Sequence, residues 1–423
     1  NHMIKVLGII AEYNPFHHGH LYHLQESIKQ INPDYTVVVM SGHFTQRGEA
    51  TIIDKWDRTA IALQAGVDLV LELPVTYACQ TAELFAFGAV QLLNHTGVVT
   101  HLSFGSEFAD LQVLDTIASI LAIEPDEYKK RLKFHLGLGL SFPRARLFAL
   151  SEYISSHEPL LTYQPEYIKS IMNSSNAILA IEYLKAIKRT NSPIKPFPIP
   201  RIGSSYNDTE MKGKFSSATA IRKQLLSTEN IQDLAQTLPS YSFQILKENI
   251  QMGRGPVTNQ ALEQLILGNI RRSNLEEIRT WMDVEEGLEN RIKKFGYSSS
   301  SIEQFLAKTK TKRYAYTRLQ RILIHGLLRI STDNMKEYNK HGGPLYLRIL
   351  GFREKSRFLL THLKNNAKVP VISKAADYTR HGSRLLNRMF ETDVLATDLY
   401  SLGFPGQYHR TGGQDFTMPI LII

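Results

Sequence analysis

The sequence predicts an α/β fold, with a doubly wound parallel sheet of the Rossmann-like type in the first half and a mostly α-helical second half. Three observations predict it. Short apolar runs alternate with helical segments over the first 245 residues. A turn rich in glycine and histidine directly follows the first apolar run. Beyond about residue 240, amphipathic helical patterns dominate. Strands separated by helices of this length imply parallel βαβ units.

The first β-rich run, "IKVLGIIA", is expected to be a buried strand that leads into "EYNPFHHGHLYHL". A helix is predicted from Gly19 to Ile31, with apolar residues at Leu21, Leu24 and Ile28, and "NPD" closes it. "YTVVVM" is the next expected strand and "SGHFTQRGE" its loop.

A helix over residues 55–64 is expected to end at "AGVD", where the glycine suits a helix C-terminus. "LVLEL" predicts a third strand, "TAELFAFGAVQLLN" a third helix and "THLSFGSE" a fourth strand. Ligands of such sheets bind outside the carboxyl ends of the strands, where residues 15–20, 41–48 and 105–107 are expected to lie.

"SPIKPFPIPR" carries four prolines and is therefore expected to be extended. It leads to "RIGSSYND" and to a predicted helix in "FSSATAIRKQLL". "LEQLILGNIRR", "YTRLQRILIHGLLRI" and "LYLRILGF" have amphipathic helical patterns. Two domains are expected, residues 1–245 and 246–423, with the boundary near "MGRGPVTN".

An apolar content of 43% describes a soluble globular protein, and runs such as "VVVM" are much shorter than a membrane helix of roughly 20 residues. "NHM" is typical of a cloning remnant, Met3 is the expected natural start, and no leader is expected. Cys79 is the only cysteine, which excludes a disulfide framework and a cysteine-based zinc site. A cytoplasmic protein is therefore expected.

Charge is distributed unevenly along the chain. Residues 1–250 hold 22 Lys and Arg against 24 Asp and Glu, whereas residues 291–390 hold 22 against 5. Such a surplus favours a polyanionic partner over an ordinary solvated helix surface. Because arginines and aromatic residues are interleaved in "TKTKRYAYTRLQR", RNA is the expected partner, with Lys312, Arg313 and Arg318 as candidate RNA contacts.

The histidines in "EYNPFHHGHLYHL" allow three interpretations: a zinc site, a histidine-rich helix start, or a phosphate site. His17, His20 and His23 are spaced like ligands on one helix face, but no HExxH pattern or cysteine accompanies them, so no metal site is predicted. A strand followed by a turn, a glycine and a helix instead favours phosphate. Gly19 permits close backbone approach, and His17 and His20 can donate to phosphate oxygens in the transition state.

"FHHGH" resembles the HxGH signature of the nucleotidyltransferase superfamily, which is related to the HIGH motif of class I aminoacyl-tRNA synthetases. "KFSSATAIR" is similar to the second motif of that superfamily and suits a second phosphate cradle, although "SSATA" also suits a plain helix cap. Ser217, Thr219, Ile221 and Arg222 match this motif, and Ala218 departs from it.

Further segments narrow the resemblance to the tRNA(Met) cytidine acetate ligase family. "MSGHFTQRGE", "DKWDRTAIALQAGVDLVLELP", "FGSE", "SSNAILAIEY" and "RIGSSYND" occur in the order expected for that family. His18 and His43 stand where the family usually has asparagine, and Ser175 and Ala180 replace a proline and a glycine.

The resemblance implies an enzyme that activates acetate with ATP, delivered with Mg²⁺, and passes the acetyl group from acetyl-adenylate to N4 of the wobble cytidine of elongator tRNA(Met). His17 and His20 are the implied catalytic residues. The implied ATP-binding residues are Ile10, Ala11, Glu12, Tyr13, Asn14, Pro15, Phe16, His17, His18, Gly19, His20, Leu21, Tyr22, His23, Gly105, Asn176, Arg201, Ser217, Thr219 and Arg222.

Two alternatives remain from the sequence: a small-molecule adenylyltransferase of the same superfamily, and a non-catalytic RNA-binding protein on that fold. "SGHFTQRGE" and "DKWDRTA" also bring Arg47, Lys55 and Arg58 toward the expected ligand edge. Arg47 or Lys55 is expected either to meet acetate or tRNA phosphate, or to form a surface salt bridge with Glu49, Asp54 or Asp57.

Overall fold

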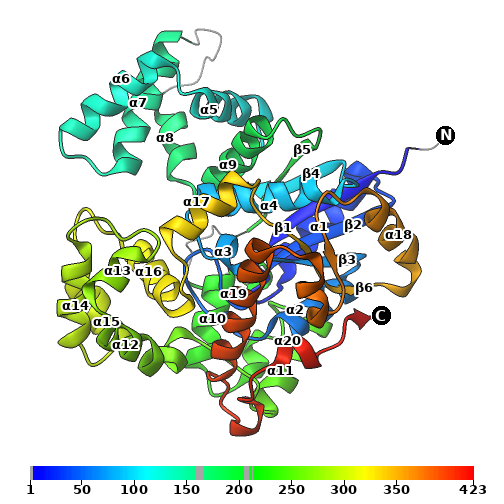
Figure 1. Ribbon diagram of the computed structural model, residues 1–423. Coiled ribbons are helices and arrows are strands. Elements are labelled where there is room, and N and C mark those ends of the chain that lie inside the picture. Colours follow the sequence, from blue (N-terminus) through cyan, green and yellow to red (C-terminus); the bar gives the residue numbers. More distant parts are fainter. Residues whose placement is uncertain (1–2, 158–164, 204–208, 212) are drawn as a thin grey trace.

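A computed structural model describes residues 3–157, 165–203, 209–211 and 213–423. Within these residues an eight-stranded sheet forms the centre of the fold (Figure 1), in the order β5-β4-β1-β2-β3-β6-β7, with β8 paired to β6. Five strands from the first half run parallel: β1 (Val6–Ala11), β2 (Tyr35–Ser41), β3 (Leu69–Leu73), β4 (His101–Ser106) and β5 (Lys195–Pro200). The predicted α/β class and parallel sheet are confirmed.

Successive strand residues face opposite sides of the sheet, and both sides are covered. Leu7 and Val38 pack in one core with α1 (His18–Ile31), α2 (Lys55–Ala65), α10 (Ala218–Ser227) and α11 (Ser240–Gln251). Val6 and Val37 pack in the other core, together with α3 (Val75–Ala78), α4 (Ala82–Thr96), α5 (Leu111–Ile123) and α9 (Ser175–Arg189). Burial on both faces explains why these strands are continuously apolar.

Two groups of helices project on the same side of the molecule (Figure 1). One comprises α6 (Asp126–Gly137), α7 (Phe142–His157) and α8 (Pro165–Asn173). The other comprises α12 (Glu263–Arg272), α13 (Leu275–Thr280), α14 (Leu288–Tyr297), α15 (Ile302–Thr309) and α16 (Tyr316–Leu328). The remaining long helices are α17 (Thr332–Lys340), α18 (Arg357–Asn366) and α19 (Arg384–Ser401).

The predicted helix in "LYLRILGF" is wrong, because this segment forms strand β6 (Leu347–Phe352). β6 runs antiparallel to β3 and is buried throughout. Most of its residues are apolar because both faces of the sheet are covered there. A short apolar run of this kind does not distinguish a strand from a buried helix. Two short strands, β7 (Val371–Ile372) and β8 (Leu421–Ile422), pair with β6.

The last part of the chain therefore returns to the sheet of the first half. Lys55 on α2 meets Asp415 on α20 (Gln414–Thr417) at 2.7 Å, and Val75 N–H donates to Asp393 on α19 at 2.7 Å. The division at residue 245 stays a prediction about folding units.

Candidate active site

A cavity of about 200 Å³ opens at the carboxyl ends of β1, β2, β4 and β5. Strand β1 lies between β2 and β4, so the chain order reverses at this point of the sheet, which is where open α/β sheets bind ligands. The residues that line the cavity come from both histidine- and serine-containing motifs, from the loop after β2 and from α9.

The first motif forms the N-terminus of α1. His17 is the N-cap residue, and its Nδ1 accepts a hydrogen bond from Gly19 N at 3.0 Å. His20 Nδ1 accepts from His17 N at 3.2 Å, and the two imidazole rings stack with centroids 3.8 Å apart. The two side chains thus cap the helix reciprocally, and both rings line the cavity.

These hydrogen bonds fix the protonation state of both rings. Each Nδ1 accepts a hydrogen bond, so the ring proton of each neutral imidazole resides on Nε2. Burial and the nearby Arg201 lower the pKa of His17 to about 3, and burial and His17 hold the pKa of His20 well below its usual value. At neutral pH the pair therefore presents two neutral N–H donors at the helix N-terminus, an arrangement suited to phosphate oxygens.

The second motif forms the N-terminus of α10 on the other side of the cavity. Ser217 is the N-cap residue and accepts from Ala220 N at 3.0 Å. Arg222 donates to Asn14 O at 2.9 Å and to Glu49 Oε2 at 3.1 Å, and it lies within 3.5 Å of Thr219 Oγ1. Arg222 thus connects the two predicted cradles directly.

Asn14 contributes an unsatisfied donor to the same region. Its Oδ1 accepts from Ile52 N at 2.9 Å, while its buried Nδ2 has no hydrogen-bond partner among the described residues. Because Asn14 lines the cavity, this amide is available to a ligand with acceptor oxygens.

His23, Gly105, Asn176 and Arg201 form another wall. The Ser27 hydroxyl donates its proton to His23 O, so Ser103 Oγ must be the donor in its hydrogen bond with Ser27 Oγ. Since the Ser103 proton is then used, Ser103 Oγ accepts from His23 Nε2 at 3.0 Å. Asn176 donates to Glu107 at 2.6 Å and accepts from Arg201 at 3.4 Å. A Cβ added to Gly105 would lie 3.3 Å from Arg201 Cγ, so the glycine keeps this wall open. In the motif "RIGSSYND", residues 204–208 lie outside the described residues.

Not all of the predicted ATP-binding residues reach the cavity. Pro15, Phe16, His18 and Leu21 do not line it, and Phe16 is buried against Tyr13 in the core. The other predicted ATP-binding residues do line it: Ile10, Ala11, Glu12, Tyr13, Asn14, His17, Gly19, His20, Tyr22, His23, Gly105, Asn176, Arg201, Ser217, Thr219 and Arg222.

Lys55 and Arg58 are not ligand residues in this structure. The Lys55 ammonium is fully buried and lies 2.9 Å from Glu72 and 2.7 Å from Asp415. It does form a salt bridge, but the expected surface position and the expected partners are wrong for Lys55. Arg58 is fully buried and donates to the carbonyl oxygens of Ser41 and Ile53, which ties the end of β2 to the loop before α2. Arg47 does line the cavity and donates to Ser175 at 3.3 Å.

An apolar wall of the cavity was missed by sequence analysis. Phe85 on α4 and Leu179 and Tyr183 on α9 line it. In the sequence these residues have the spacing of ordinary core positions, so no local signal distinguishes them.

The segment that carries the candidate tRNA contacts lies beside the cavity loop. Gln320 on α16 donates to Arg47 O at 2.9 Å. Lys312 and Arg313 are exposed, and Arg313 forms an ion pair with Glu285 at 2.7 Å. Arg318 is half-buried and forms an ion pair with the same Glu285 at 3.1 Å. Lys312 and Arg313 thus remain open to solvent, although Arg313 shares Glu285 with the less exposed Arg318.

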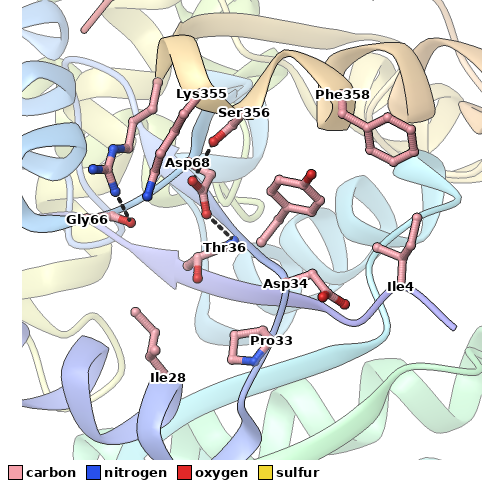
Figure 2. A pocket seen from close by; sticks show the side chains of 12 residues that line it. Ile4, Ile28, Pro33, Asp34, Thr36, Gly66, Asp68, Lys355, Ser356 and Phe358 are labelled. Carbon is pink, nitrogen blue, oxygen red and sulfur yellow. Dashed lines mark hydrogen bonds between the residues drawn. The ribbon is translucent and has the colours of Figure 1, made fainter. Parts of the chain in front are cut away.

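A larger cavity of about 570 Å³ lies at the opposite edge of the sheet, where β2 and β3 begin (Figure 2). Its central carboxylate, Asp68, already accepts from Thr36 N at 2.9 Å and from Ser356 Oγ at 2.5 Å. None of the predicted site residues lines it. Size alone therefore does not identify the active site, and the chemistry favours the smaller cavity.

Neither a metal cage nor a membrane helix is found in the described part of the chain. There, no three His, Cys, Asp or Glu side chains are grouped so that they could hold a metal ion. The helices described here include none that is long and apolar enough to span a membrane.

Comparison with known proteins agrees with this geometry. Residues 4–415 match the family described as HIGH Nucleotidyl Transferase. The chain is 44% identical to a protein of Acetivibrio thermocellus named tRNA(Met) cytidine acetate ligase, over 99% of this chain and 100% of that one. A protein of the same name from Thermoanaerobacter sp. is 44% identical over 98% of this chain and 99% of that one.

Two solved structures are similar over nearly the whole chain. The apo crystal structure of Thermotoga maritima TmcAL has a TM-score of 0.95 at 39% identity and covers 99% of this chain and 100% of that chain. The structure of the same protein bound with alpha-thio ATP has a TM-score of 0.92 at 38% identity, with 99% of each chain covered.

Proposed function

The chain belongs to the tRNA(Met) cytidine acetate ligase family within the HIGH nucleotidyl transferases, and on that premise we propose that it is an ATP-dependent ligase that acetylates a tRNA(Met) cytidine. One structural observation carries the proposal: the two motifs predicted to bind phosphate, at the N-termini of α1 and α10, line the same cavity and are joined through Arg222. A similar protein that binds an ATP analogue supports the choice of nucleotide.

In the first step, acetate attacks the α-phosphorus of ATP and pyrophosphate leaves, which gives acetyl-adenylate. Such a reaction depends on positioning and on stabilising charge, with little covalent chemistry for the protein. In this proposal, His17 and His20 donate from Nε2 to the α- and β-phosphates. Ser217, Thr219 and Arg222 hold the departing pyrophosphate, and Asn14 Nδ2 supplies a further donor.

The adenosine is proposed to lie along β4 and α9. Gly105 keeps the backbone of β4 accessible, and Asn176 and Arg201, which line the same wall, are proposed to meet the ribose or the base. Mg²⁺ is proposed to enter with ATP as the counter-ion of its phosphates, since the described residues provide no cage of their own for it.

In the second step, the acetyl group passes to N4 of the wobble cytidine of elongator tRNA(Met), and AMP leaves. Lys312, Arg313 and Arg318 are proposed to bind the tRNA near the cavity mouth, with residues 1–245 carrying the adenylation chemistry and residues 246–423 most of the tRNA affinity. The protein is proposed to act in the cytoplasm.

The proposal is tested by incubating the protein with ATP, labelled acetate and a tRNA pool, followed by nucleoside analysis of the tRNA. Acetate-dependent label in N4-acetylcytidine of tRNA(Met) supports it. Release of a dinucleotide from a small phosphorylated substrate, without labelled tRNA, would instead indicate an adenylyltransferase. RNA binding without acetate-dependent pyrophosphate exchange would indicate a binding protein without catalytic activity.

A further inference from the structure

The proposed transfer step requires a proton acceptor. A C–N bond forms between the acetyl carbonyl carbon and cytidine N4, the C–O bond to the phosphate breaks, and AMP leaves with that electron pair. One of the two N4 protons must go to a base, because the product is a neutral amide. The inference below rests on the proposed function and concerns the group that accepts this proton.

The histidines of the cavity are poorly suited to that role. His17 and His20 each use Nδ1 as a hydrogen-bond acceptor and carry their proton on Nε2, so neither ring has a nitrogen lone pair free. His23 also carries its proton on Nε2, toward Ser103. Burial and Arg201 lower the pKa of His23 to about 4, which makes its Nδ1 a weak base.

Two carboxylates line the described part of the cavity, Glu12 and Glu49. Glu49 is partly exposed, and its Oε2 accepts from Arg222 at 3.1 Å. Glu12 directly follows β1 and lies two residues before Asn14, whose carbonyl oxygen accepts from Arg222 of the second motif at 2.9 Å. Its Oε2 accepts from Gln46 N at 2.8 Å, which fixes the carboxylate, and its Oε1 has no donor among the described residues.

We propose that the Glu12 carboxylate accepts the proton that cytidine N4 loses as the acetyl group is transferred to it. Gln46 N–H holds one oxygen of the carboxylate and leaves the other for the substrate amine. The proton passes from Glu12 to solvent after the acetylated tRNA leaves. Glu12 is thus assigned a catalytic role in the second half-reaction, in addition to the position next to ATP that the sequence predicts.

The surroundings of Glu12 match this role. Burial raises the pKa of Glu12, and Glu49 adds to this, while the Gln46 hydrogen bond, Arg222 and Arg47 partly oppose it. A carboxylate whose pKa lies above the ordinary value is a stronger base than an ordinary carboxylate. The other neighbouring groups are the neutral His17 and His20, the buried Cys79 thiol, and Arg58, which donates to the Glu12 carbonyl oxygen.

The test supplies synthetic acetyl-adenylate and tRNA(Met) to the enzyme and measures single-turnover acetyl transfer between about pH 5 and pH 8.5, which bypasses the ATP step. The wild-type rate is expected to rise with pH as Glu12 ionises and then to level off. Glu12→Gln is expected to lower the plateau about a hundredfold or more and to abolish the rising limb. Glu12→Asp keeps a carboxylate, so its transfer rate is expected to rise with pH as in the wild type, but to a lower plateau.

Glu49→Gln is the matched control, because it removes the other carboxylate of the cavity and is expected to keep the limb. The proposal is overturned if Glu12→Gln transfers acetyl within about threefold of wild type with an unchanged limb, which would indicate that the leaving phosphate takes the proton. Should Glu12→Gln fail to fold, loss of the limb in Glu12→Asp would equally overturn it. Absence of transfer by the wild-type enzyme would count against the proposed function itself, not against the role of Glu12.

Discussion

The imidazole of His20 stacks on that of His17 with centroids 3.8 Å apart, and His20 Nδ1 accepts a hydrogen bond from the backbone N–H of His17. Each ring is thus oriented by the other residue of the pair. A phosphate that binds at this helix end meets two N–H donors already in position, which is the condition under which such donors lower a barrier.

His17→Ala and His20→Ala are each expected to slow acetyl-adenylate formation about a hundredfold or more, the scale for loss of a preorganised donor. Acetate-dependent pyrophosphate exchange measures the effect, and circular dichroism verifies the fold. His18→Ala is the control, since His18 does not line the cavity, and it is expected to change the rate less than about threefold. Near-normal exchange in a folded His17 or His20 variant would remove the phosphate-donor role.

Buried neutral histidines make folding sensitive to acid. His43 is 2% exposed, and burial followed by Lys55 holds its pKa well below the usual value. Above the unfolded-state pKa of about 6.5 the folded form incurs no penalty, and below it the unfolded chain binds protons that the folded form does not. Stability should therefore fall as the pH decreases below about 6.5, by up to about 1.4 kcal/mol per pH unit for each such histidine.

His43→Asn removes one of these groups and should flatten the slope between about pH 6.5 and pH 5.5. Urea unfolding of both proteins at several pH values measures it. An equal slope in the variant would show that His43 already titrates in the folded state.

Gly19 has little room for a side chain. A Cβ at this position would lie 2.8 Å from His17 Cε1 and 3.0 Å from His17 Nδ1. Gly19→Ala is therefore expected to displace the His17 ring and to lower pyrophosphate exchange about tenfold or more. Gly268→Ala on α12 is the matched control, because nothing lies within 4 Å of the added methyl group, and full activity is expected there. Equal activity of the two variants would mean that the position of the His17 ring does not matter.

A part of the site could be predicted from the sequence when the residues that form it lie close together along the chain. The two cradles were predictable because strand, turn, glycine and helix N-terminus are local features, and "FHHGH" and "SSATAIR" contain them within a few residues. The two cradles contact each other through Arg222 and Asn14, and this contact depends on the order of the strands in the sheet. A pattern of apolar runs predicts a parallel α/β sheet but does not specify that order.

The errors arose where distant segments decide the structure. The strand at Leu347–Phe352 forms because β3 offers it a buried edge, and nothing within "LYLRILGF" signals that edge. The partner of Lys55 was not predicted, because Asp415 lies 360 residues further along the chain.

Lys312 and Arg313 test the predicted RNA surface most directly, since both side chains are exposed whereas Arg318 is half-buried. Lys312→Gln/Arg313→Gln is expected to weaken tRNA binding and to reduce the slope of log affinity against log salt by about one to two, because fewer counterions are released. Pyrophosphate exchange should be unchanged. Lys355→Gln/Lys364→Gln on the opposite side of the sheet is the charge-matched control. If both double variants bind tRNA equally well, the tRNA surface lies elsewhere.

The last prediction concerns the buried ions that join the end of the chain to α2. Lys55 Nζ lies 2.9 Å from Glu72 Oε1 and 2.7 Å from Asp415 Oδ1, and Arg348 lies 2.8 Å from the same Asp415 oxygen. Burial raises the pKa of Asp415, but Lys55 and Arg348 outweigh it and hold this pKa well below the usual range. Removal of Lys55 leaves two buried carboxylates with one cation, which costs about 3–5 kcal/mol of unfolding free energy.

Lys55→Met should show this loss in urea unfolding, while pyrophosphate exchange per folded molecule stays near wild type because Lys55 does not line the cavity. Lys55→Met/Asp415→Asn removes opposite charges together and is expected to lose at least about 1 kcal/mol less than the sum of the single variants, since contacting ions are coupled. Strict additivity would mean that the two side chains do not form an ion pair. Loss of exchange in folded Lys55→Met would restore the interpretation in which this lysine meets acetate.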